Sequence, residues 1–280
     1  MQKKKLRFPG GLLKAFTMSY DDGVEQDVRL IEIMRRYGVK GTFNINAGLF
    51  AKEGVRYPEG QVHRRMDKAS IIKAYEGDDI EVAVHAYTHP FLESVPTASA
   101  MYDVICDRAA LEDTFGCIIR GMAYPYGTYN DNVCDILRLA GIAYSRTTET
   151  RLNFDIPKDW LKMGATCHHN NPKLMDLADE FLNTAPTDRK DGYLFYLWGH
   201  AYEFEGNDNW NVIEEFLEKI GNRDDIWYAT NIEVYDYVKA YEALEFSVDM
   251  KIVHNPSSID VWTLIDKDVV HIPAGKTVRI

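Results

Sequence analysis

The sequence has few cysteines, fewer positive than negative charges and no long apolar run, and each shortage excludes a class of protein. Its four cysteines show no Cys-x-x-Cys spacing, so we expect reduced thiols, with Cys167 alone near the predicted site. The net charge of −11 argues against a nucleic-acid-binding surface, which needs a basic face. No apolar segment approaches the roughly 20 residues of a membrane-spanning helix.

The first residues also lack the pattern of an export signal. The stretch from Met1 to Lys5 is basic, but the stretch from Leu6 to Gly10 supplies no apolar segment of the required length. We therefore expect a cytoplasmic protein without membrane or nucleic-acid partners. No internal repeat or low-complexity segment interrupts the chain.

A hydrophobic content of 46% in 280 residues is enough for a sizeable core. Apolar runs typical of buried strands alternate with amphipathic helical patterns, which predicts parallel βα units. About eight such units close most simply into a barrel, with the active groups at the carboxyl ends of its strands. The expected strands are 12–18, 39–46, 80–84, 118–124, 142–146, 161–166, 193–198 and 226–230, and the expected helices are 24–37, 68–75, 101–115, 130–140, 210–220 and 231–244.

The pattern changes after residue 245 to short β-rich pieces joined by turns. These pieces are 248–253, 261–265, 269–272 and 277–280. A tail of about 35 residues is too short for a core of its own. We therefore predict a distorted (β/α)7–8 barrel over residues 1–245, with a β-rich extension, 246–280, packed on it.

Two carboxylates follow the first predicted strand, in Asp21-Asp22-Gly23. Neighbouring side chains at a strand end point in different directions, so one aspartate can bind a cation while the other faces a bound water. The alternative is a solvated turn. Asn46, at the end of the next strand, is a candidate substrate contact.

His85 and His89 follow another strand and would stand roughly 13 Å apart in an extended chain. One helical turn would make them neighbours, and with Asp22 they would form the three-ligand set of a catalytic zinc. Two surface histidines in a turn are the alternative interpretation.

Other strand ends carry further candidates. His200 ends an apolar strand, where it is either a site residue or a hydrogen-bonded core histidine. The backbone N–H of Tyr126 could donate to an oxyanion. His168 is a ligand, a substrate contact or a loop residue, and Tyr124 and Trp198 are candidate sugar contacts, although core packing explains aromatic residues equally well.

Four ordered motifs resemble those of the polysaccharide deacetylase family of carbohydrate esterases, over roughly residues 12–244. Ser19 to Gly23 resembles the family's Thr-Phe-Asp-Asp-Gly, and His85 to His89 its His-(Ser/Thr)-x-x-His. Ala123 to Gly127 resembles its Arg-x-Pro-Tyr-Gly, and Leu197 to His200 its Leu-x-x-His.

The resemblance implies that Asp22, His85 and His89 bind one divalent metal ion, with Asp21 as the base and His200 as the acid. Zinc is the expected ion, with cobalt, nickel or manganese as alternatives. The implied reaction is hydrolysis of N- or O-linked acetyl groups on an oligo- or polysaccharide. Hydrolysis of a small cyclic amide or ureide, and non-catalytic sugar binding, are the alternative functions.

The chain departs from the family pattern in three places. Ala86 stands where the family has serine or threonine, and the segment from Asp155 to Trp160 is only a loose match to its aspartate-tryptophan motif. Ala123 stands where the family has an arginine beside the base. Because side chains alternate along the fifth strand, we predict that Arg146 replaces this arginine and contacts Asp21, directly or through one other residue; the alternative is a surface arginine at the start of a loop.

Overall fold

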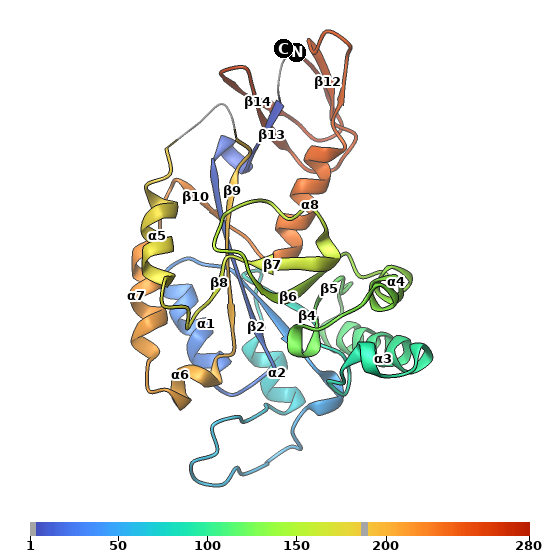
Figure 1. Ribbon diagram of the computed structural model, residues 1–280, viewed down its shortest axis with the longest axis vertical. Helices are drawn as coiled ribbons and strands as arrows, with labels where there is room; N and C mark the ends of the chain where they lie inside the picture. Colours follow the sequence, from blue (N-terminus) through green and yellow to red (C-terminus); the bar gives the residue numbers. More distant parts are fainter. Residues whose placement is uncertain (1–3, 186–189) are drawn as a thin grey trace.

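The structure is a computed structural model that describes residues 4–185 and 190–280. Its centre is a nine-stranded sheet of parallel strands in the order β7-β6-β5-β4-β3-β2-β9-β8, with β10 beside β2 (Figure 1). The bounds are β2 (Lys14–Asp21), β3 (Gly41–Ile45), β4 (Ile80–Val84), β5 (Gly121–Ala123), β6 (Tyr144–Thr150), β7 (Met163–Ala165), β8 (Cys167–His168), β9 (Tyr193–Gly199) and β10 (Ile226–Tyr228).

One short segment closes this sheet into a barrel. β7 pairs with β6, and β8, only one residue later in the chain, pairs with β9 at the other end of the sheet. Between them, the Thr166 N–H donates to the Tyr196 carbonyl at 2.8 Å. Because β7 is irregular in register and β10 covers only the first half of β2, the ring is uneven. The prediction of a distorted (β/α)7–8 barrel is confirmed.

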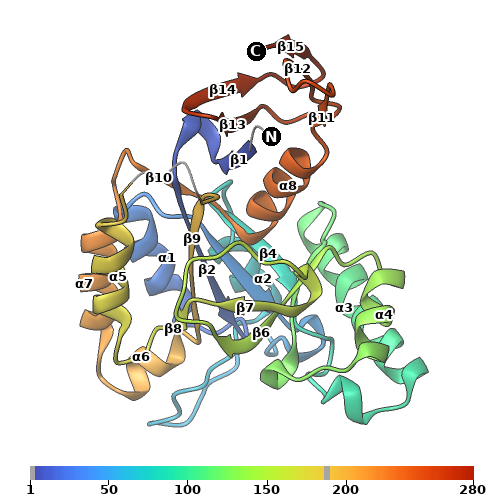
Figure 2. The same cartoon turned by 45° about the horizontal axis from the view of Figure 1, so that its top comes forward.

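Helices cover the outside of the barrel, with α1, α5 and α7 grouped on one side and α3 and α4 on the other (Figures 1 and 2). In α7 the buried residues Ile213, Phe216, Leu217 and Ile220 recur at helical spacing, so one face packs on the sheet. The bounds are α1 (Asp27–Arg36), α2 (Lys68–Ala74), α3 (Thr97–Phe115), α4 (Asp131–Leu139), α5 (Leu174–Leu182), α6 (Tyr202–Gly206), α7 (Trp210–Ile220) and α8 (Asn231–Glu242). No helix in the described part of the chain has the length and apolar character to cross a membrane.

The C-terminal strands form two three-stranded antiparallel sheets above one end of the barrel (Figure 2). One contains β13 (Val261–Ile265) and β14 (Asp268–Ile272), together with β1 (Lys4–Arg7) from the other end of the sequence. The other contains β11 (Glu245–Phe246), β12 (Ile252–His254) and β15 (Thr277–Arg279). Val253, Val261 and Ile272 are buried against the end of α8. The division of the chain at residue 245 stays a proposal.

Some elements differ from the sequence prediction. β1, α5, α6 and β8 are additional, and the expected strand 248–253 is reduced to β12. The sequence predicts Asn231 as the N-cap of the last barrel helix, but the N-cap of α8 is Thr230, because the Thr230 hydroxyl and the Glu233 side chain form a reciprocal capping box. Asn231 is buried and accepts a hydrogen bond from the Thr17 hydroxyl instead.

Candidate active site

The two aspartates at the end of β2 face different partners. Asp21, the last residue of β2, accepts a hydrogen bond from the Asn44 amide at 2.9 Å. Asp22 has a positive φ of 87°, which is rare for a residue with a side chain. Its carboxylate lies 2.9 Å from the Arg65 guanidinium and 3.3 Å from His63 Nε2. The two carboxylates are therefore free to have separate roles.

His85 and His89 lie beyond β4 with their Nε2 atoms 3.2 Å apart. The connection between them is a bend with positive φ at Ala86 (61°) and His89 (56°), so the expected helical turn is wrong. The bend nevertheless brings the two imidazole rings together. His85 Nδ1 lies 2.8 Å from the Ala123 carbonyl oxygen and donates a hydrogen bond to it. The Nε2 atom of the neutral ring then carries a free lone pair.

Asp22, His85 and His89 bring one donor atom each within 4.8 Å of the others. Burial lowers the pKa of His85, and burial together with the neighbouring His85 lowers the pKa of His89 to about 4, so both rings are neutral ligands at pH 7. Two neutral imidazoles and a carboxylate are the donor set of an open catalytic zinc site. The residues therefore fit a divalent metal ion.

A buried polar shell holds the backbone of the histidine bend. Asn46 donates to the carbonyls of His85 and Ala86 and accepts a hydrogen bond from Arg65. Asp107 accepts the N–H of His85 at 2.9 Å, and burial raises the pKa of this carboxyl to about 8. Asn46 is 1% exposed, so its predicted role as a substrate contact is wrong: its polar atoms are used within the protein.

Arg146 lies against Asp21. It is directly opposite Ala123 in the β5–β6 register, and its guanidinium donates a hydrogen bond to Asp21 Oδ2. The predicted contact is therefore present, while its part in catalysis stays a proposal. Burial alone would raise the pKa of Asp21, but the charge of Arg146, the largest opposing effect, holds it below its usual value.

His200 follows β9 and lies between two carboxylates. Its Nε2 is 3.8 Å from Asp21 Oδ2, and its Nδ1 is 2.9 Å from Glu203 Oε1. Burial lowers the pKa of His200, but the Glu203 hydrogen bond and the charges of Asp21 and Asp22 outweigh it, so the pKa is raised. Sequence reasoning missed Glu203, although it stands three residues after His200, a spacing that places both on one helical face.

The remaining predicted contacts fall on the rim or in the core. Tyr126 is 51% exposed, stacks on Phe91 at 3.8 Å between ring centroids and meets the His89 ring edge-on at 4.5 Å. The Trp198 ring covers the Arg146 guanidinium, 4.3 Å from its central carbon, and meets His168 edge-on. Tyr124 is a wrong prediction: it is 1% exposed, and its hydroxyl donates to the Leu161 carbonyl in the core.

The polar connection between β3 and α2 supplies two residues that sequence reasoning missed, His63 and Arg65, both on Asp22. Arg64, between them, forms ion pairs with Glu25 and Glu205 and fixes the connection on the barrel. The sequence identifies 52–65 as a polar excursion after a strand, which is typical of substrate loops. It does not identify which side chains turn inward.

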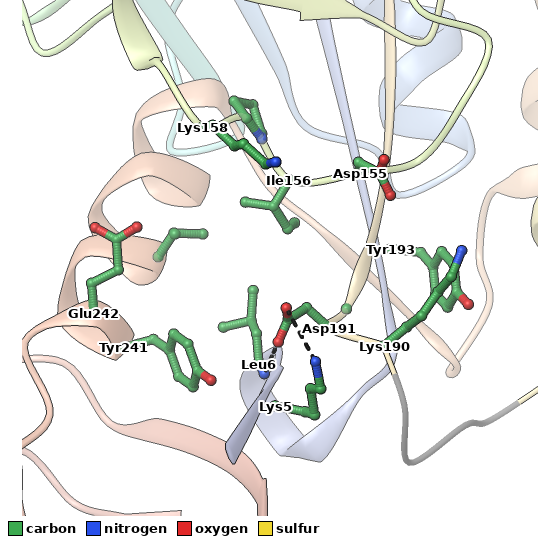
Figure 3. A pocket seen from close by; sticks show the side chains of 13 residues that line it. Lys5, Leu6, Asp155, Ile156, Lys158, Lys190, Asp191, Tyr193, Tyr241 and Glu242 are labelled. Carbon is green, nitrogen blue, oxygen red and sulfur yellow. Dashed lines mark hydrogen bonds and ion pairs between the residues drawn. The ribbon is translucent and has the colours of Figure 1, made fainter. Parts of the chain in front are cut away.

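A cavity of about 520 Å³ lies beside the start of β9 and the end of α8 and is lined by none of these site residues (Figure 3). Its lining includes Asp155, Asp191 and Tyr193. Asp155, the loose match to the family's aspartate, is exposed and lines this cavity. Glu203 contacts His200.

Comparison with protein families gives one match, to the model described as polysaccharide deacetylase, over residues 13–145. This range contains Asp21, Asp22, His85 and His89. It ends one residue before Arg146 and does not contain His200. A comparison with curated proteins finds no match. The match confirms the resemblance inferred from the sequence motifs.

The chain is similar to solved structures at low sequence identity, and the two with TM-scores of 0.50 or more share its fold. A Mycobacterium smegmatis protein assigned as a polysaccharide deacetylase is 18% identical, with a TM-score of 0.58 and coverage of 86% of this chain and 96% of that one. A family 4 carbohydrate esterase from Streptomyces lividans in complex with acetate is 14% identical, with a TM-score of 0.50 and coverage of 78% and 93%. The Streptococcus pyogenes deacetylase PplD in complex with acetate is 18% identical with a TM-score of 0.45, and the alignment covers 52% of this chain and 61% of that one.

Proposed function

Residues 13–145 match the family model described as polysaccharide deacetylase, and from this premise we propose that the chain is a metal-dependent hydrolase that removes acetyl groups from a carbohydrate. The observation that supports the proposal most is the position of Asp21. Its Oδ2 lies 3.9 Å from His85 Nε2 and 3.8 Å from His200 Nε2. A base therefore lies between a metal ligand and an acid.

A divalent ion, zinc by expectation, held by Asp22, His85 and His89 would polarise the acetyl carbonyl and lower the pKa of a bound water. Asp21 takes the proton of the attacking water, and Arg146 keeps this carboxylate ionised and oriented. The water oxygen forms a bond to the acetyl carbon, and the bond from that carbon to the sugar nitrogen or oxygen breaks. The Tyr126 N–H donates to the oxygen that becomes negative.

His200 delivers the second proton to the leaving amine or alkoxide. It is suited to this task because Glu203 holds its Nδ1–H, which raises the pKa of the ring and directs Nε2 toward Asp21. Trp198 and His168, at the same rim, lie beside the acid and would contact the substrate. The expected products are free acetate and the deacetylated sugar.

Acetate release from acetylated chito- and xylo-oligosaccharides tests the proposal. Protein stripped of metal should be inactive and should regain activity with zinc, cobalt, nickel or manganese. Asp21→Asn, loaded with the same ion, is the control for acetate from a contaminating enzyme. Hydrolysis of an allantoin-like ureide without acetate release from any sugar would contradict the proposal and favour the cyclic-amide alternative.

A further inference from the structure

A second group of metal-ligating side chains includes the acid His200. His168 comes from β8, His200 follows β9 and Glu203 is in α6, and one donor atom from each lies within 4.8 Å of the others. The three come from separate elements, and β8 and β9 are paired directly at His168 and Trp198. The barrel wall itself therefore brings this group together.

Glu203 is the centre of the group. Its Oε1 lies 2.9 Å from His200 Nδ1, and its Oε2 lies 3.4 Å from His168 Nε2 and 3.1 Å from His169 Nε2. The Asn170 amide donates to Oε2 at 2.8 Å. Three imidazoles around one carboxylate are more than a single hydrogen-bonded histidine pair requires.

His169 is the feature that the proposed reaction leaves unexplained. Its side chain is completely buried, stacked between the rings of Tyr20 and Phe204. Its Nε2 lies 3.1 Å from Glu203 Oε2, whereas its Nδ1 has no hydrogen-bond partner among the described residues. A buried polar group without a partner is rare in a folded protein and indicates a missing water or ion.

We propose that His168, His200 and Glu203 bind a second divalent cation, zinc by preference, with the buried His169 ring packed behind Glu203. Imidazole and carboxylate are ligands that zinc favours. The side chains of His168, His200 and Glu203 are 21%, 22% and 23% exposed, so a cation can enter from solvent and keep a water. Asp22, His85 and His89 belong to the first site and are not shared.

Filling the second site would inhibit the enzyme, a consequence that rests on the proposed function. The cation replaces the proton on His200 Nδ1, and that proton leaves to solvent. The ring then keeps only its Nε2 proton, which a neutral imidazole gives up far less readily than an imidazolium ion does. Excess zinc would therefore remove the acid while the first site stays filled.

Zinc binding by equilibrium dialysis, followed by elemental analysis, tests the site without any substrate. Wild type should bind two equivalents per chain, and His168→Ala and Glu203→Gln should each bind one. His85→Ala should lose only the other equivalent. His271→Ala is a matched control, since His271 is also a histidine 2.9 Å from a carboxylate, that of Asp260, and it should keep both. A single equivalent in wild type at millimolar zinc, or a second one retained by both His168→Ala and Glu203→Gln, would overturn the proposal.

The inhibitory consequence is read as a ratio: turnover with excess zinc divided by turnover at one equivalent, for each protein separately. This ratio should fall well below one in wild type and in His271→Ala, and stay near one in His168→Ala. Equal ratios in wild type and His168→Ala would show that the second ion does not affect the acid. Absence of deacetylation would contradict the proposed function, while the dialysis result would still decide whether the second site exists.

Discussion

Arg146 and Asp21 form an ion pair enclosed by protein, with 1% and 3% of their side chains exposed. Burying two charges is costly and is compensated only when they meet each other and further hydrogen-bond partners. Asn44 donates to the second oxygen of Asp21, and the Trp198 ring covers the guanidinium. The pair therefore fixes one carboxylate in one charge state and one orientation.

Removing the guanidinium should cost turnover and leave metal binding intact. In Arg146→Ala, Asp21 keeps its burial but loses the charge that lowers its pKa, so its carboxylate is less ionised and less well oriented. We expect kcat to fall about 10²-fold or more, since a general base contributes about 10²–10⁴, with metal content unchanged by elemental analysis. Arg138→Ala, which removes a half-exposed arginine paired with Asp135, is the matched control.

The register of β5 and β6 allows a sharper version of this test. Ala123 and Arg146 are directly opposite each other, so an arginine at either position starts from neighbouring points on the barrel wall. The double variant Ala123→Arg/Arg146→Ala should recover part of the lost kcat. Turnover no higher than that of Arg146→Ala, in a protein that keeps its metal and its circular dichroism spectrum, would count against the replacement.

The metal content of the variants should distinguish the roles of Asp21 and Asp22. Asp22→Asn should lose the ion as well as activity, because Asp22 supplies the anionic ligand of the set. Asp21→Asn should keep the ion and lose about 10²–10⁴ in rate, the usual contribution of a general base. Elemental analysis beside kinetics measures both, and equal metal loss in the two variants would show that both carboxylates are ligands.

The pH dependence of kcat should report how Glu203 sets the pKa of His200. Because the pKa of His200 is raised, the protonated acid persists above the ordinary histidine value of about 6.5, and kcat should fall only at higher pH. In Glu203→Gln the pKa of His200 should fall, so the decline of kcat at high pH, the basic limb of the profile, should move to lower pH. The profile is measured with one metal equivalent. Glu215→Gln, an exposed residue of α7, should leave the limb in place, and an unmoved limb in Glu203→Gln would contradict the assignment.

Asp27 should make stability fall as pH rises. Burial raises the pKa of its carboxyl to about 8, whereas an unfolded aspartate titrates at about 3.9. Between these values the folded protein binds more protons than the unfolded chain, so the free energy of unfolding decreases with increasing pH. Asp27→Asn should flatten this slope in urea titrations, since an amide oxygen can still accept from Tyr75 and Val24. Asp113→Asn, an exposed control, should keep the wild-type slope.

The sequence is sufficient to predict the alternation of the barrel and the residues at its strand ends, because both depend on local periodicity and chain direction. It fails where a side chain's direction depends on distant elements. Tyr124 follows β5 but points toward α4, where its hydroxyl lies 3.6 Å from Cys134 Sγ. The side-chain amide of Asn46 donates its hydrogen bonds to the backbone carbonyls of His85 and Ala86, which lie 39 and 40 residues further along the chain. Glu203 lies in a helix of five residues, too short to show an amphipathic period.

The pairing of β1 with β13 has a consequence for the order of folding. Lys4 is matched with Ile265, so this ladder joins residues more than 250 positions apart and cannot form until the barrel segments between them have been synthesised. Closing so long a loop is entropically expensive unless the barrel has already brought its ends together. We therefore expect β1 to be protected from hydrogen exchange late in refolding. A chain shortened before β13 should leave this first strand without its partner and open to proteases.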